Sequence, residues 1–127
     1  MTNEEVVLRA MTELFINRDT SAIERYWGTP YVQHDPDLPD GKDALGDMVE
    51  QLPADFKYEP GMMAAKGDIV LIHSRVTGWD PKPLVVVDIF RMKDGKLVEH
   101  WDVAQEEVPA TETKSGRPMF DSALSEK

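Results

Sequence analysis

The chain has 127 residues, no cysteine and a formal net charge of −10, with 14 lysines and arginines against 24 aspartates and glutamates. The negative field repels phosphate backbones and anionic lipid surfaces, and the lack of cysteine excludes disulfides, thiol nucleophiles and zinc–thiolate sites. A composition of 41% hydrophobic and 30% charged residues is typical of one folded globular domain. We expect neither nucleic acid nor membrane as a partner, and a cytoplasmic location, because the opening residues do not resemble a signal sequence.

The first part of the chain is predicted to be helical. Thr2 and Glu5 have the spacing of a capping box, and apolar residues recur at helical spacing over residues 6–15. Ser21 and Glu24 repeat the capping-box pattern before a short second helix, which the glycine and proline that follow should end.

An extended piece is expected over residues 31–34, followed by a turn rich in proline and aspartate. Asp40 is the predicted cap of a third helix, whose apolar face covers residues 44–52 and which ends at Pro53. These two segments complete the N-terminal half of the chain.

From residue 56 onward the pattern is that of β-strands. Four apolar stretches are separated by turn residues, namely FKYEP, IVLIHSRV, PLVVVDIFRM and KLVEHWDVAQ. Because helices come first and a sheet follows, the sequence predicts an α+β fold with the helices packed on a mostly antiparallel sheet. We expect one domain over residues 1–108 and a polar tail over residues 109–127 that carries Met119 and Phe120.

The last two strands form a predicted hairpin with three ionisable residues in apolar surroundings, Asp88, His100 and Asp102. Burying an ionisable group without a partner is costly, so these residues either face water or serve a function. The flanking valines and isoleucine around Asp88 make a partner necessary there, and His100 is the nearest candidate.

The turn sequence KDGK is compatible with two registers of this hairpin. A two-residue type I′ loop places Asp88 opposite Trp101 and sends His100 and Asp102 to the other face. A three-residue loop with Gly95 in a left-handed bulge places Asp88 opposite His100 and on the same face as Asp102, with Trp101 facing away. We favour the bulged register because the three ionisable groups can then partner one another.

Four stretches carry a resemblance to a known family, YVQHDPDLPDGKDAL, IVLIHSRV, VDIFRMKDGKLVEHWDVAQ and SGRPMFD. Over nearly the whole chain they resemble the SnoaL-like branch of the nuclear transport factor 2-like superfamily. The resemblance implies a conical roll, in which a strongly curved sheet encloses a pocket under the N-terminal helices, and a homodimer. In the polyketide cyclases of that branch, an aspartate of the last strand is acid and base in an intramolecular aldol condensation without a cofactor.

Asp102 stands where that aspartate would be, and Asp88 stands where the cyclases would have a histidine. The superfamily also contains isomerases, dehydratases, epoxide hydrolases and binding proteins, so the resemblance leaves the reaction open. We assign Asp102 as general base and acid, His100 or His34 as the donor to a developing oxyanion, and Asp88 as the residue that orients His100.

Each of these residues also has an ordinary structural interpretation. Asp102 is otherwise a solvent-facing strand residue, His100 a core histidine and His34 a turn residue. A second group contacts the substrate or, alternatively, belongs to the core or the strand surface: Trp27, Tyr31, Met63, His73 and Phe90.

The sequence thus predicts a cofactor-independent enzyme that moves protons on a small carbonyl-containing molecule, as an aldol cyclase or an isomerase-like lyase. The alternatives are a non-catalytic small-molecule-binding protein of the same fold, or a hydrolase or dehydratase of the superfamily. We expect no metal, because the three histidines include no short-spaced pair such as H-x-H, and the sequence contains neither a nucleophile elbow nor a phosphate loop.

The outer face of the hairpin predicts a partner. An apolar surface centred on a tryptophan is rarely left in water, so we expect a second copy of the chain to cover it in a homodimer. Met119 and Phe120 would then strap onto the partner subunit, whereas in a monomer the tail would fold back over this same outer face of its own hairpin. In the favoured register this outer face consists of Ile89, Arg91, Leu97, Glu99 and Trp101.

Overall fold

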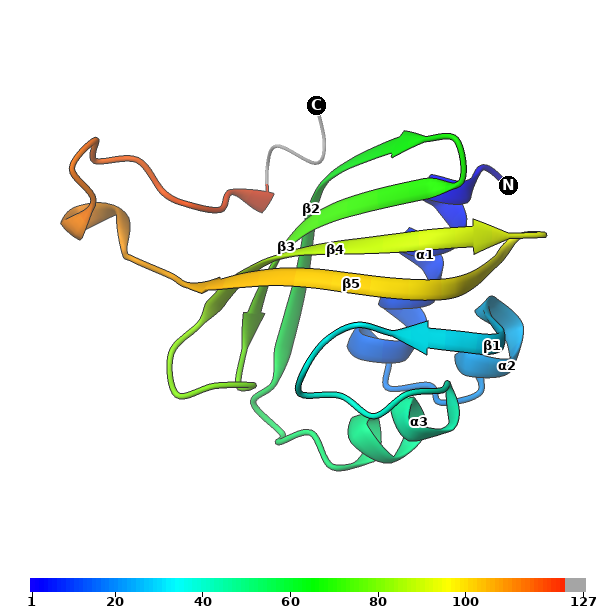
Figure 1. The fold of residues 1–127 in the computed structure, drawn as a ribbon. Helices are drawn as coiled ribbons and strands as arrows, with labels where there is room; N and C mark the ends of the chain where they lie inside the picture. Colours follow the sequence, from blue (N-terminus) through cyan, green and yellow to red (C-terminus); the bar gives the residue numbers. More distant parts are fainter. Residues whose placement is uncertain (123–127) are drawn as a thin grey trace.

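A computed structural model describes residues 1–122, in which helices cover one face of a curved five-stranded sheet (Figure 1). The helical elements are α1 (Asn3–Met11), a π-helical turn (Thr12–Ile16), α2 (Ala22–Tyr26), α3 (Asp43–Glu50) and a 3₁₀ turn (Ala110–Glu112). The strands are β1 (Trp27–Gln33), β2 (Lys57–Lys66), β3 (Ile69–Thr77), β4 (Leu84–Lys93) and β5 (Lys96–Glu106). None of the described helices is long and apolar enough to cross a bilayer.

The predicted cap of the first helix is confirmed, and the other two are wrong. Thr2 and Glu5 form a reciprocal capping box at the start of α1. Ser21 precedes α2 without capping it, because its hydroxyl bonds to the Asp19 carboxylate instead. Asp40 does not cap α3, since its carboxylate accepts a 2.8 Å hydrogen bond from the backbone N–H of Gln33. Asp40 therefore ties the loop before α3 to the end of β1.

The strands have the order β1-β5-β4-β3-β2, and β1 pairs parallel to β5 while the other neighbours are antiparallel. The extended piece expected over residues 31–34 is therefore part of a longer edge strand, which makes the sheet mixed. Register shifts occur in β2 between Pro60 and Met63, and between β4 and β5 beyond Arg91. Such irregularities increase the local twist and bend a sheet, which fits the strong curvature visible in Figure 1.

The hairpin between β4 and β5 differs from both predicted registers. Its loop has two residues, Asp94 and Gly95, both with positive φ, as a type I′ turn requires. The extra residue lies in β5 itself, where Val98 has no partner between the pairs Met92↔Leu97 and Arg91↔Glu99. The three-residue loop is thus wrong, because the left-handed residues satisfy the shorter turn and the bulge forms further along the strand.

The bulge at Val98 changes which side chains of β5 point inward, as the predicted three-residue loop would also have done. Asp88 lies directly opposite Asp102, not opposite His100 as predicted, and Trp101 lies on the other face. Leu97, expected on the outer face, is fully buried, because it precedes the bulge and shares the inner face. The grouping of the three ionisable side chains on one face, with Trp101 facing away, is confirmed.

Gly28 of β1 leaves room for this bulge. A β-carbon at Gly28 would lie 2.8 Å from Val98 Cγ1, closer than two carbons can approach. The glycine that was expected to end the second helix therefore permits the parallel edge strand to pack on β5.

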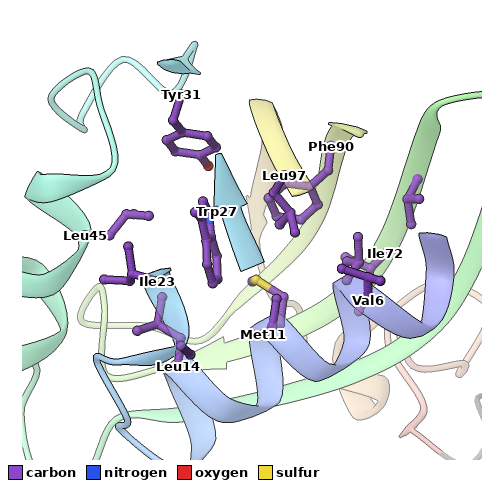
Figure 2. Close-up of a cluster of buried hydrophobic side chains, with 14 of the residues drawn as sticks. Val6, Met11, Leu14, Ile23, Trp27, Tyr31, Leu45, Ile72, Phe90 and Leu97 are labelled. Carbon is purple, nitrogen blue, oxygen red and sulfur yellow. The ribbon is translucent and has the colours of Figure 1, made fainter. Parts of the chain in front are cut away.

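The core lies between α1, α2 and the inner face of the sheet, as Figure 2 shows. Apolar side chains of α1 reach the strands at helical spacing, and Trp27, at the start of β1, fills the space between the helices and β5. The buried cluster includes Val6, Val7, Ala10, Met11, Leu14, Ala22, Ile23, Trp27, Tyr31, Leu45, Val49, Tyr58, Val70, Ile72, Phe90, Met92 and Leu97.

The tail leaves the end of β5 and turns back toward β2 and β3 (Figure 1). Phe120 is buried against Gly61 of β2, and its ring lies 5.5 Å from that of His73 of β3, on the outer face. The Met119 sulfur accepts a hydrogen bond from the backbone of Val108. The tail thus packs on its own chain over β2 and β3, whereas the alternative to a strap on a partner subunit had placed it over the outer face of the hairpin around Trp101.

Candidate functional site

A cavity of about 450 Å³ lies between the inner face of the sheet and the helices. Aromatic and aliphatic side chains form most of its wall, and polar groups come from β1, β4, β5 and the loops that follow β1 and β3. The lining residues include Trp27, Tyr31, Gln33, Asp35, Asp37, Phe56, Tyr58, Trp79, Asp80, Val86, Asp88, Phe90, His100, Asp102 and Glu106.

Strand alternation brings Asp88, His100 and Asp102 together in this cavity. Asp88 and Asp102 are cross-strand partners. His100 lies two residues before Asp102 on β5 and therefore on the same face. His100 Nε2 lies 2.7 Å from Asp88 Oδ1, and both side chains are buried. One nitrogen or oxygen atom from each of the three residues lies within 4.8 Å of those of the other two.

Gln33 determines that Nδ1 of His100, the ring nitrogen that does not face Asp88, carries a proton. Gln33 Oε1 accepts a hydrogen bond from the backbone N–H of Asp35 at 3.1 Å, which orients the side-chain amide. His100 Nδ1 lies 2.6 Å from the same oxygen and must therefore carry a proton and donate. The remaining proton is shared between His100 Nε2 and the Asp88 carboxylate, so the pair has no net charge in either arrangement.

Asp102 is the carboxyl group of the cavity whose pKa is raised toward neutrality. Burial raises its pKa from the ordinary value of 3.8 to about 7, assisted by a hydrogen bond with the Asp35 carboxyl group, and His100 opposes the rise. Repulsion from Asp35 and Asp88 contributes further to the increase. Near neutral pH this carboxyl group is therefore present in both its protonated and its ionised form.

Trp27, Tyr31 and Phe90 line the cavity, as the sequence predicted, and Figure 2 shows the Tyr31 hydroxyl on the side of its ring that faces Trp27. Met63 packs against the core and is not part of the wall. His73 points to the outer face, where it meets Phe120, because it alternates with the inward-facing Ile72 and Ser74.

His34 also lies outside the cavity, which corrects its predicted role as a donor to the substrate. Its ring stacks on that of Trp101 at 4.8 Å between centroids, and its Nε2 lies 2.7 Å from Glu99 Oε2. The guanidinium of Arg91 lies on Trp101 as well and bonds to Glu99. Because β1 continues to alternate as far as Gln33, His34 falls on the opposite side.

Three residues of the site were missed by sequence reasoning: Gln33, Asp35 and Tyr58. The alternation of Tyr31, Gln33 and Asp35 along the end of β1 and the start of the following loop was the available signal, but the segment was interpreted as irregular before Pro36. Tyr58 Oη and Trp27 Nε1 are buried and make no hydrogen bond of ordinary length; the Ser74 hydroxyl lies near the first and the Tyr31 hydroxyl near the second. Burial, and after it the nearby Asp88 carboxylate, raise the pKa of Tyr58, so that its hydroxyl remains a donor.

Asp88, His100 and Asp102 are the described residues whose spacing suits a metal ion. Both nitrogens of His100 are already engaged, so coordination would require Asp88 or Gln33 to give up its hydrogen bond. The contacts that are present favour a proton shared within the pair over a cation between its members.

Comparison with known proteins identifies the fold. A family model described as a SnoaL-like domain matches residues 8–100. No curated protein matches the chain. An NTF2-like protein from Cytophaga hutchinsonii superposes with a TM-score of 0.70 at 15% identity, covering 83% of this chain and 91% of that one.

Two other structures superpose on the same elements. A candidate ketosteroid isomerase from Kribbella flavida has a TM-score of 0.69 at 16% identity, with coverage of 82% of this chain and 78% of that one. A candidate polyketide cyclase from Acidithiobacillus ferrooxidans has a TM-score of 0.66 at 19% identity, with coverage of 81% and 87%. At these identities the similarity concerns the fold alone, and it confirms the predicted conical α+β roll.

Proposed function

The chain belongs to the SnoaL-like domain family, and on that premise we propose that it is a cofactor-independent general acid/base enzyme for a small carbonyl-containing molecule. The observation that carries the proposal is a carboxyl group, Asp102, with a pKa near 7 inside a cavity of substrate size. A general base works best when its pKa lies near the operating pH.

The chemical steps follow from this arrangement. Ionised Asp102 takes a proton from the carbon next to the substrate carbonyl, and the electron pair moves onto the carbonyl oxygen. Protonated Asp102 then returns the proton, either to another carbon of the same molecule, as in an isomerisation, or to the alkoxide that an intramolecular aldol closure forms. His100 and Asp88 hold each other in place beside Asp102 and keep the wall of the cavity charge-balanced.

The developing oxyanion requires a hydrogen-bond donor, and His34 and His100 are engaged elsewhere. Tyr58 and Trp27 line the cavity, and their Oη and Nε1 atoms are buried behind its wall, with the Ser74 and Tyr31 hydroxyls as polar neighbours. A donor without a strong hydrogen bond in the free protein loses little when it turns toward charge on the substrate. We assign the oxyanion site to these two groups.

The pH profile tests the role of Asp102. The active form is the carboxylate, so kcat/KM of an identified substrate should rise with pH and level off above an apparent pKa near 7. A profile that rises only near pH 4 would show that the titrating base is a carboxylate in an ordinary environment, and would contradict the assignment.

Tyr58→Phe is expected to lower kcat by about 10²-fold, because it removes one oxyanion donor. The same variant should stay within about 1 kcal/mol of the wild type in stability toward urea, since the lost hydroxyl makes no hydrogen bond of ordinary length in the fold. Tyr26→Phe is the matched control: its hydroxyl bonds to Glu13 outside the cavity, so stability should fall while kcat stays unchanged. Equal loss of kcat in both variants would contradict the role of Tyr58.

We further propose that a second copy of the chain covers the outer face of the sheet. Leu71, Ile89 and Trp101 lie side by side on neighbouring strands there, and Val87 pairs with Val103, whose side chain is 69% exposed. These residues replace Leu97 in the expected surface and extend it across three strands. An apolar area of this kind is typical of a subunit interface.

Sedimentation equilibrium tests this assembly. At micromolar concentration we expect a mass near twice 14.4 kDa, and Trp101→Glu should return the protein to 14.4 kDa by placing a charge in the apolar contact. Leu8→Glu, a change at an exposed position of α1, should leave the dimer intact. A wild-type protein that stays at 14.4 kDa would contradict the dimer.

A further inference from the structure

The side-chain amide of Gln33 is held in one orientation from both of its ends. Its Oε1 accepts a 3.1 Å hydrogen bond from the backbone N–H of Asp35, and a backbone N–H can only donate. The amide nitrogen donates toward the hydroxyl of Tyr31, a residue of the buried core. Exchanging the oxygen and the nitrogen would set two donors against each other at Asp35, so the amide does not turn over.

The backbone around Gln33 aims this amide at the imidazole of His100. Gln33 is the last residue of β1 and the register partner of His100 on β5. Its backbone N–H donates to the Asp40 carboxylate at 2.8 Å, and the backbone N–H of His34 donates to the carbonyl oxygen of His100 at 2.9 Å. Main-chain contacts on both sides thus fix where the side chain of Gln33 begins.

The oxygen of Gln33 restricts the protonation states of the Asp88–His100 pair. His100 Nδ1 lies 2.6 Å from Gln33 Oε1, a distance at which an unprotonated nitrogen would place two lone pairs in contact. The excluded state has a net charge of −1: Nε2 donates to the Asp88 carboxylate, and Nδ1 carries no proton. The pair therefore keeps one additional proton and remains neutral.

The charge of this pair acts on Asp102. One nitrogen or oxygen atom from each of Asp88, His100 and Asp102 lies within 4.8 Å of those of the other two. Burial, and after it the carboxyl groups of Asp35 and Asp88, raise the pKa of Asp102, whereas His100 lowers it. A negative charge on the pair would oppose the ionisation of Asp102 further, because like charges at this separation repel.

The rest of the described wall offers no cation that could balance such a charge. It contains neither lysine nor arginine, and the helices contribute only apolar side chains to it. His100 is therefore the only basic side chain of this wall, and its proton is decisive. The titratable groups that face the cavity are Tyr31 of β1, Tyr58 of β2, Asp88 of β4, His100, Asp102 and Glu106 of β5, and Asp35, Asp37 and Asp80 of the loops.

We propose that Gln33 is a positioning residue of the site: by holding the proton on His100 Nδ1 it keeps the Asp88–His100 pair neutral, and it thereby allows Asp102 to give up and regain its own proton. The inference rests on the proposed function in that it concerns the same acid/base residue. It adds a residue that acts through His100.

Imidazole nitrogen resonances test the first step without a substrate. In protein labelled with ¹⁵N at histidine, His100 Nδ1 should keep the chemical shift of a protonated nitrogen from pH 6 to pH 8.5. The other two histidines are assigned with His34→Gln and His73→Gln, at positions outside the cavity. In Gln33→Leu, which has no acceptor, Nδ1 should lose its proton within this range, whereas Gln51→Leu, at an exposed position outside the cavity, should behave as the wild type.

Gln33→Glu provides a rescue, because a carboxylate oxygen still accepts from Nδ1. His100 should keep its Nδ1 proton over the whole range in this variant. An unprotonated Nδ1 in the wild type or in Gln33→Glu, or a protonated one throughout in Gln33→Leu, would overturn the proposal. The wild type and Gln33→Glu decide the matter even if Gln33→Leu does not fold.

A second titration follows the side-chain carboxyl carbon of Asp102, which is identified by its absence in Asp102→Asn. In the wild type half of these groups should be ionised near pH 7. In Gln33→Leu the midpoint should lie at about pH 8 or above, because the pair can then carry a negative charge. Gln51→Leu should leave the midpoint unchanged. A midpoint that stays in place or falls in Gln33→Leu would contradict the role of Gln33.

The result is separable from the test of catalysis. An Asp102 that titrates near pH 7 and does not respond to Gln33→Leu would reject the role of Gln33 and leave the proposed acid/base chemistry intact. Normal turnover in Asp102→Asn, together with the expected response to Gln33→Leu, would reject the chemistry and support the control of Asp102 ionisation by Gln33.

Discussion

Asp102→Asn is expected to lose about 10²–10⁴-fold in turnover and, at the same time, to become more stable than the wild type above pH 7. The amide keeps the shape of the side chain and cannot accept the substrate proton. It also removes the charge that the fold disfavours, because burial and the neighbouring carboxyl groups raise the pKa of Asp102 to about 7. A residue that served only the structure would show the opposite, a loss of stability.

The direction of the pH dependence follows from the two states of the chain. In the unfolded chain Asp102 titrates near its ordinary pKa of 3.8, and in the folded chain near 7, so folding favours the protonated form. The ionised carboxylate lowers the free energy of unfolding of the wild type. This loss is absent below pH 4, grows as the pH rises toward 7, and levels off above it. The variant should thus match the wild type at pH 4 and exceed it at pH 8.

Thermal unfolding at pH 4 and pH 8 measures this difference. At pH 8 we expect the Tm of Asp102→Asn to lie at least about 3 °C above that of the wild type. Glu112→Gln makes the same change in net charge at an exposed position and should change Tm by less. A variant with normal turnover, or one less stable than the wild type at pH 8, would remove Asp102 from the proposed mechanism.

Asp88→Ala is expected to destabilise the fold by about 2–4 kcal/mol, the second large effect. It leaves His100 Nε2 buried without the carboxylate that lies 2.7 Å away. Urea unfolding at pH 7 gives the free-energy change, with Asp68→Ala as the control, since Asp68 pairs with Arg91 at an exposed site and its loss should cost less than about 1 kcal/mol.

A double replacement distinguishes an uncompensated polar group from simple loss of packing. Asp88→Leu with His100→Phe removes both members of the pair and fills their volume, so stability should recover to within about 1 kcal/mol of the wild type while turnover stays low. A cost for Asp88→Ala no greater than that for Asp68→Ala would show that the buried pair is not the constraint inferred from its geometry.

Local sequence patterns were sufficient for most of the secondary structure. The capping box at Thr2, the apolar spacing of α1 and the last three strands depend on neighbours a few residues away, so they could be predicted. The first two strands were placed only in part: β2 continues to Lys66 beyond the expected FKYEP stretch, and β1 begins at Trp27, before the expected residues 31–34. The position of Asp102 opposite Asp88 could not, because the turn sequence permits more than one register and Val98 has no local feature that marks a bulge. The common face was predicted correctly although the loop length was not.

The remaining errors have a tertiary cause. Whether Gln33 or His34 faces the cavity depends on the phase of β1, which its parallel pairing with β5 determines and its own residues do not. The contact between the Asp35 and Asp102 carboxyl groups joins a loop to a distant strand. Tyr58 was not distinguished from other core aromatics, because the absence of a partner for its hydroxyl is visible only in three dimensions.

The unpaired position of Val98 bears on how proteins of this fold can change in length. Deleting a paired residue of β5 would invert every side chain between the deletion and the end of the strand, and would turn His100 or Asp102 out of the cavity. A deletion at Val98 would remove the bulge alone, since Leu97 and Glu99 would keep their partners on β4. The number of residues between the Asp94-Gly95 turn and Asp102 is therefore free to vary by one, and an alignment gap at this point is compatible with an unchanged cavity wall.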